Sequence, residues 1–115
     1  MKEVTIAGAM ARRIDRKIVQ TETTKPNLFM PVLSKFYGIV IRMLCARQFD
    51  ARFHAIYENS ELVVRIWPLA IVQGEAPRRV REMVLEWAAQ HQQELLSAWH
   101  RCTFGQPPLR IAPLQ

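Results

Sequence analysis

The chain has 115 residues, half of them hydrophobic, which is enough for one domain with a modest core and too few for two. Sixteen Lys and Arg residues against ten Asp and Glu give a net charge of +6, which favours acidic partners such as nucleic acid or an acidic protein. No stretch approaches the roughly 20 apolar residues of a membrane span. A soluble cytoplasmic protein with no membrane partner is therefore expected.

The first 29 residues differ in character from the rest. A basic run at 11–17 precedes a polar run at 21–27. Three interpretations remain open: a short basic helix that touches nucleic acid or a membrane surface, a marginal helix with a flexible linker, or upstream sequence if translation starts at Met30. We therefore expect an N-terminal extension over 1–29 and a single domain over 30–115.

The middle of the chain predicts a small antiparallel sheet. Residues 36–44 are rich in β-branched and aromatic side chains, which indicates a first strand. Residues 52–57 and 61–67 flank the turn residues 58–60 and predict a hairpin. Alternation along 61–67 directs Leu62, Val64 and Ile66 into the core. Residues 70–73 predict a short fourth strand that ends at Gly74.

A helix is predicted from Pro77 to Arg101. Proline suits the first helical turn, and apolar residues then recur at helical spacing for more than five turns. Gly105 and the two following prolines end it, and residues 109–114 are extended, an edge-strand candidate. The predicted fold is α+β: an antiparallel sheet of three to four strands packed on one long C-terminal helix.

The two cysteines, Cys45 and Cys102, are far apart and have neither C-x-x-C nor Cys/His spacing. This pattern indicates neither a disulfide framework nor a zinc site. We expect free cysteines packed as small hydrophobic side chains in a reducing cytoplasm, because nothing near them in sequence would activate a thiol.

A series of motifs along the chain resembles a bacterial family, the domain-of-unknown-function family four-one-six-zero. The motifs are Met30-Pro31, Ser34, Phe36 to Ile41, Met43, Phe53-His54-Ala55, Tyr57, Gly74, Pro77-Arg78-Arg79, Trp87, His91, Leu95, Trp99, Ile111, Pro113 and Leu114. The resemblance implies the toxin-like half of a type II toxin–antitoxin pair, commonly encoded beside a partner of domain-of-unknown-function family two-four-four-two. It also implies a start at the Met-Pro that is Met30-Pro31 here.

One departure from the family pattern concerns the candidate site. The family usually has Pro-Pro-His before its Phe-His-Ala, whereas this chain has Asp50-Ala51-Arg52. Arginine cannot act as a base near neutral pH, so Arg52 in place of a first histidine puts any paired-histidine site in doubt here.

His54, Arg52 and Tyr57 are the candidate catalytic residues. Imidazole gains and loses a proton near neutral pH, as a general acid or base must. With Lys35 and Arg42 from neighbouring strands, His54 or Tyr57 would move a proton while cationic side chains stabilise a phosphorane. The alternative is that His54 is a half-buried, hydrogen-bonded strand residue without a catalytic role.

Arg78, Arg79 and Arg81 crowd the start of the predicted helix, where the helix dipole disfavours positive charge. Such a cluster is a candidate for contacts with phosphates or an acidic antitoxin. A solvated face paired with Glu75 and Glu82 is the alternative.

The chain has no glycine-rich phosphate loop, serine-hydrolase motif or metal-ligand cluster, so we expect no cofactor and no metal. The leading hypothesis is a toxin that binds a cognate antitoxin and acts on RNA or translation around His54, Arg52 and Tyr57. The alternatives are a non-enzymatic interaction module or co-repressor subunit of such an operon, and a stand-alone nucleic-acid binder. Whether the protein is an enzyme stays open at this stage.

Overall fold

The computed structural model describes residues 30–45 and 50–115. The predicted N-terminal extension, residues 1–29, lies outside the described residues, as does the segment 46–49.

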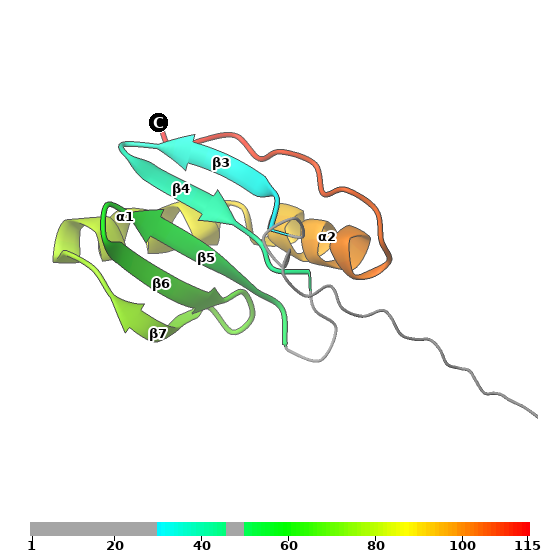
Figure 1. The fold of residues 1–115 in the computed structure, drawn as a ribbon, viewed down its shortest axis with the longest axis horizontal. Helices are drawn as coiled ribbons and strands as arrows, with labels where there is room; N and C mark the ends of the chain where they lie inside the picture. The colour runs from blue at the N-terminus through cyan, green and yellow to red at the C-terminus, as the bar shows by residue number, and fades with distance from the viewer. Residues whose placement is uncertain (1–29, 46–49) are drawn as a thin grey trace, which may run out of the picture.

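The described residues form an α+β fold with two layers. One layer is a five-stranded antiparallel sheet in which every strand pairs with the next along the chain. The other layer contains two helices that lie on one face of this sheet (Figure 1). The strands are β3 (Val32–Phe36), β4 (Ile39–Arg42), β5 (Arg52–Tyr57), β6 (Ser60–Arg65) and β7 (Ala70–Glu75), and the helices are α1 (Arg78–Gln90) and α2 (Gln92–Thr103).

The predicted single strand over 36–44 is wrong, because a tight turn divides this region into β3 and β4. Tyr37 and Gly38 have φ angles of 51° and 80°, as the central residues of a type I′ hairpin turn require. The β3 strand begins earlier than predicted, at Val32. The sheet consequently has five strands where three to four were expected.

The core lies between the sheet and the helices. Alternate residues of the central strands point into it, and the expectation that Leu62, Val64 and Ile66 are core residues is confirmed, since each is fully buried. Trp87 of α1 is fully buried at the centre, with its ring centroid 5.4 Å from that of Phe36 and 5.7 Å from that of Phe53. These contacts join the helix layer to strands at two places in the sheet.

The prediction of one long helix is wrong, because the helix is divided into two at a single residue. His91 has φ −122° and ψ 25°, which ends α1, and α2 begins at the next residue. Side-chain contacts support this break: His91 is hydrogen-bonded through Nδ1 to Glu94, and Gln92 Nε2 donates to the Ile66 carbonyl oxygen over 2.8 Å. Neither contact changes the apolar spacing, which continues from Trp87 to Leu95 across the break.

The C-terminal segment, residues 104–115, returns along the edge of the sheet beside β3 (Figure 1). It is not a strand, but Ile111 N donates to the Leu33 carbonyl oxygen over 2.9 Å. Trp87 Nε1 also donates to the Ala112 carbonyl oxygen over 2.8 Å. This segment is thereby fixed to both layers.

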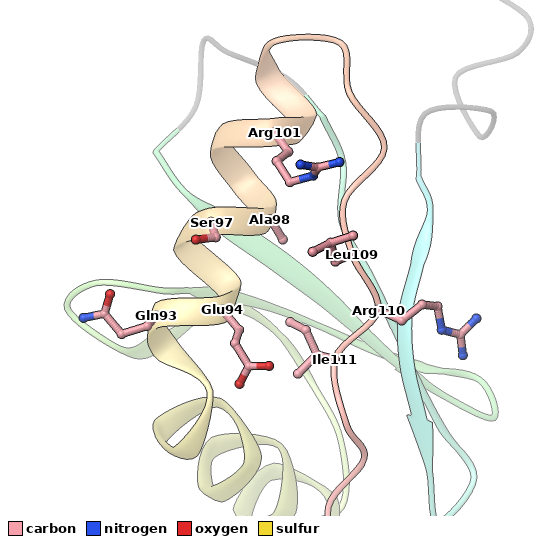
Figure 2. A pocket seen from close by; sticks show the side chains of 8 residues that line it. All are labelled: Gln93, Glu94, Ser97, Ala98, Arg101, Leu109, Arg110 and Ile111. Atoms are coloured by element: carbon pink, nitrogen blue, oxygen red, sulfur yellow. The ribbon is translucent and has the colours of Figure 1, made fainter.

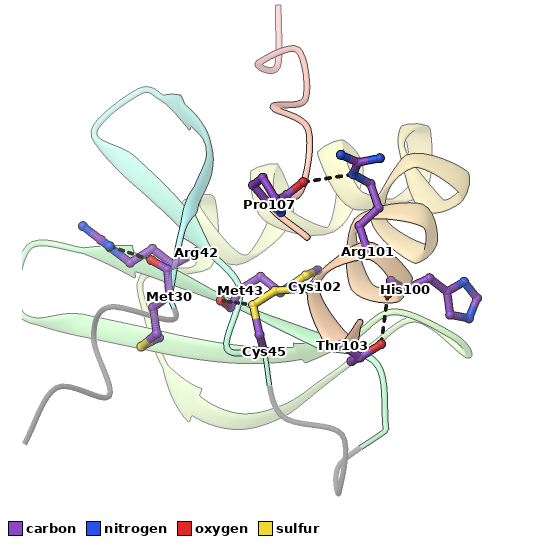
Figure 3. Close-up of a disulfide and its surroundings, with 9 residues drawn as sticks. All are labelled: Met30, Arg42, Met43, Cys45, His100, Arg101, Cys102, Thr103 and Pro107. Atoms are coloured by element: carbon purple, nitrogen blue, oxygen red, sulfur yellow. Dashed lines mark hydrogen bonds between the residues drawn. A yellow bond between two sulfur atoms is a disulfide. The ribbon is translucent and has the colours of Figure 1, made fainter. Parts of the chain in front are cut away.

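The expectation of two free cysteines is wrong. A disulfide joins Cys45, just after β4, to Cys102 in the last turn of α2 (Figure 3). Their Cα atoms are 5.2 Å apart, inside the range that a disulfide spans. The 57-residue separation gave no signal in the sequence, because only the packing of α2 beside the end of β4 brings the two positions together.

Candidate functional site

The sheet face opposite the helices carries half of the predicted site residues. We call this surface the open face. Its positions follow from the strand alternation and the pairing register, and its polar and charged members are Lys35, Arg42, Arg52, His54, Glu61, Arg65, Gln73 and Glu75.

His54 lies at the middle of the open face on β5. Its cross-strand partner on β4 is Arg42, and its Nδ1 atom is 2.7 Å from Glu61 Oε2 of β6. The His54 side chain is 15% exposed and that of Glu61 is 51% exposed. A carboxylate bonded to one imidazole nitrogen fixes the ring and leaves the other nitrogen for proton transfer, as in other histidine–carboxylate pairs.

Arg52 and Arg65 face each other across the β5–β6 pair. Like charges in opposite positions of a sheet repel, and each guanidinium here has an oxygen partner. Arg52 Nε donates to Asp50 Oδ1 over 3.2 Å, and Arg65 Nε donates to the Pro68 carbonyl oxygen over 3.0 Å. The hydrogen bond from Arg52 is the main cause that lowers the pKa of Asp50.

Charge is unevenly distributed over the open face. Arg42, Arg52, His54 and Arg65 occupy one half, which we call the basic end. The row nearer the β5–β6 hairpin instead ends in Glu61 and Glu75, which are paired across β6 and β7. An anion would therefore be attracted to the basic end rather than to the face as a whole.

The two predicted contact residues on this face differ in position. Arg42 belongs to the basic end, and its Nη1 donates to the Met30 carbonyl oxygen over 2.8 Å (Figure 3). Lys35 is exposed but pairs with Val40, one row away from Arg42 and His54. Lys35 shares the face without being part of the basic end.

Tyr57 does not join His54 and Arg52. Because it lies three positions after His54 in a strand, its side chain is on the helix-facing side of the sheet. There it packs against the core, and a Cβ at Gly38 would lie 3.3 Å from the Tyr57 ring. The predicted trio is thus divided between the two faces.

Arg78, Arg79 and Arg81 are exposed at the start of α1, in the layer behind the sheet. Arg78 forms an ion pair with Glu82, with 2.9 Å between Nε and Oε2. Arg81 Nη1 donates to the Ala76 carbonyl oxygen over 2.9 Å. The structure therefore separates this arginine cluster from the basic end, and any partner that it contacts approaches another side of the molecule.

Sequence reasoning missed Glu61 and Arg65. Both follow from the β5–β6 register, which sets Glu61 diagonally opposite His54 and Arg65 directly opposite Arg52. The predicted hairpin does not give this register, because a three-residue turn at 58–60 would pair Tyr57 with Glu61, whereas the observed two-residue turn pairs Tyr57 with Ser60.

A pocket of about 280 Å³ lies between α2 and the C-terminal segment (Figure 2). It is lined by Gln93, Glu94, Ser97, Ala98, Arg101, Leu109, Arg110 and Ile111, none of which is a predicted site residue. In the ranges 30–45 and 50–115, no group of three or more His, Cys, Asp or Glu side chains could hold a metal ion. No helix within those ranges has the length and apolar character to cross a membrane.

Comparison with known proteins identifies the family. No curated protein and no solved structure matches the chain. The family described as Domain of unknown function (DUF4160) matches residues 38–100, which include the whole basic end and Glu61. Because this match covers more than half of the 115 residues, the protein belongs to the DUF4160 family.

Proposed function

We propose that this protein is the toxin component of a bacterial type II toxin–antitoxin pair, and that it acts on RNA through the basic end of its open face. The observation that carries the proposal is the contact between His54 and Glu61, beside arginines on β4, β5 and β6. A cytoplasmic location, where RNA and a cognate antitoxin are both accessible, belongs to the same proposal. The net charge of +6 supports an acidic partner.

The proposed chemistry is hydrolysis or transesterification of the RNA backbone. His54, oriented by Glu61, takes the proton of an attacking hydroxyl group or returns one to the leaving oxygen. Arg42 and Arg52 stabilise the negative charge that develops on the phosphoryl oxygens. Tyr57 has no part in this step, because it lies on the other face of the sheet.

The test is RNA cleavage by the purified full chain. We expect His54→Ala to reduce the cleavage rate by about 100-fold or more, the usual contribution of a positioned general acid or base. Glu61→Gln keeps the shape of its side chain and should reduce the rate less. The His54 imidazole then loses the carboxylate that orients it, but it is still present to transfer a proton. Arg110→Ala removes one cation from the C-terminal segment and should leave the rate unchanged.

A second candidate function is a non-enzymatic module, either a binding partner or a co-repressor subunit of the same operon. The separation of Tyr57 from His54, and the position of the pocket away from His54, favour this candidate. It predicts a stable complex with the product of the neighbouring gene while RNA stays intact. Intact RNA at high protein concentration, together with such a complex, would replace the enzymatic proposal with this one.

A further inference from the structure

Trp67 is exposed in a way that the proposed function does not explain. Its side chain is 69% exposed, whereas Trp87 and Trp99 are 0% and 8% exposed. An exposed aromatic side chain leaves apolar area in contact with water, and a flat ligand that stacks on the ring removes this area from water. Trp67 is not part of the hydrophobic core, so its side chain is available at the surface.

The turn that carries Trp67 is attached to the basic end. Arg65 Nε donates to the carbonyl oxygen of Pro68, the residue after Trp67. Ile66 N, on the other side of Trp67, donates to the Ala51 carbonyl oxygen over 3.0 Å. The β6–β7 turn consequently lies beside the beginning of β5, where Arg52 is found (Figure 1).

An exposed tryptophan in a turn that is hydrogen-bonded to one of two facing arginines matches the composition of a nucleotide strand. Each nucleotide brings one flat aromatic base and one phosphate, and single-strand binding sites combine aromatic stacking surfaces with a basic track. A duplex would satisfy the arginines but would keep its bases stacked and inaccessible to the indole. An acidic peptide would pair with the arginines, but it does not bring a flat aromatic group with every charge as a nucleotide strand does.

We propose that the basic end binds single-stranded RNA, with one base stacked on Trp67 and the adjoining phosphates between Arg52 and Arg65. This inference rests on the proposed function and adds to it the substrate class and a specificity residue. The phosphate also relieves the repulsion between the two facing guanidinium groups.

The experiment measures the affinity of the full chain for a labelled single-stranded uridine oligomer and for an RNA duplex of the same length. We expect tighter binding of the single strand, and an affinity about ten- to a hundredfold weaker for Trp67→Ala. Trp67→Phe keeps an aromatic surface and should stay within about threefold of the native affinity. Phe104→Ala, which removes a 71% exposed aromatic side chain after α2, is the matched control and should change nothing.

A second readout is the protection of tryptophan from a soluble fluorescence quencher. Only Trp67 among the three tryptophans is exposed, so RNA should remove most of the quenching in the native protein. Unfolding curves of the variants are the folding control: a variant that loses affinity should still unfold at the same midpoint as the native protein.

The outcomes separate this inference from the one on which it rests. If the single strand binds and Arg52→Ala and Arg65→Ala weaken it while Trp67→Ala does not, the stacking inference is wrong and the proposed function stands. Equal affinity for the duplex overturns the assigned substrate class. If RNA does not bind at all, both fail. If Trp67→Ala impairs only the complex with the neighbouring gene's product, Trp67 is a protein anchor and the inference is again overturned.

Discussion

At the scale of single residues, the basic end is defined by which oxygen atoms its arginines contact. Arg52 is hydrogen-bonded to the Asp50 carboxylate, and Arg65 is hydrogen-bonded to the Pro68 carbonyl oxygen. A phosphate that enters between the two arginines therefore competes with a carboxylate at Arg52 and with a neutral carbonyl group at Arg65. Because Asp50 is exposed and lies at the margin of the face, it is the residue through which anion affinity can be tuned without disturbing the core.

We therefore expect Asp50→Asn to strengthen the binding of single-stranded RNA by a few-fold, since it removes one negative charge next to the phosphate site. The control is Glu82→Gln, which makes the same charge change beside Arg78 in the helix layer and should leave the affinity unaltered. An equal gain from both substitutions would mean that net charge, rather than the basic end, governs the affinity.

The pKa of Asp50 gives this residue a defined pH dependence. Arg52 holds that pKa below its ordinary value of 3.8, so the folded state favours the carboxylate. The contribution to stability is present above the unfolded-state pKa and is lost as the pH falls through the folded-state pKa. Asp50→Asn should accordingly lower stability near neutral pH, and its difference from the native protein should disappear as the pH falls below about 4. A difference that grows in acid or does not change with pH would contradict the assignment.

At the scale of elements, the pairing of β6 with β7 depends on one glycine. Gly74 has φ of +92°, and a Cβ there would lie 2.0 Å from the Glu61 backbone oxygen. Gly105, after α2, has φ of +79° with nothing within 4 Å of an added Cβ. The two positions share the backbone conformation and differ in available space.

Gly105→Ala should lower the free energy of unfolding by about 1–2 kcal/mol, the usual cost of a left-handed conformation for alanine. Gly74→Ala should cost clearly more, because β7 must also shift away from β6. Denaturant titration measures both values. Equal costs would show that the β6–β7 pairing adapts to the added methyl group.

The disulfide is the second element-scale feature that can be tested. It links the end of β4 to α2 across a 57-residue separation, and a cross-link of this length typically contributes about 2–4 kcal/mol. Replacing Cys45 and Cys102 by serine should reduce stability by this amount and remove any effect of reductant. Thiol titration of the protein with both cysteines, unfolded without reductant, is the check. Two reactive thiols would show that the cysteines are free.

At the scale of the whole molecule, periodicity predicted the two-layer α+β arrangement and the core positions of Leu62, Val64 and Ile66. It failed where single residues override a continuing pattern. Tyr37 is an unusual residue for a left-handed turn position, so the β3–β4 hairpin was hidden inside an apolar run. His91 interrupts the helix without glycine, proline or a change of spacing.

The candidate site was predicted only in part. Alternation placed Arg52 with His54, but the same alternation separates Tyr57 from them. Glu61, Arg65 and the disulfide depend on register and tertiary packing, which local sequence patterns do not contain. The open face as a surface emerges only when the five strands are paired.

The measurement that tests the central claim most directly is bacterial growth after controlled expression of the full chain, alone and with the neighbouring gene's product. The native protein should arrest growth, the neighbour should relieve the arrest, and a His54→Ala, Arg52→Ala double variant should permit normal growth while still forming the complex. Arrest by the double variant equal to that of the native protein would contradict the assignment of the basic end as the active surface. Normal growth with the native protein would contradict the toxin proposal itself.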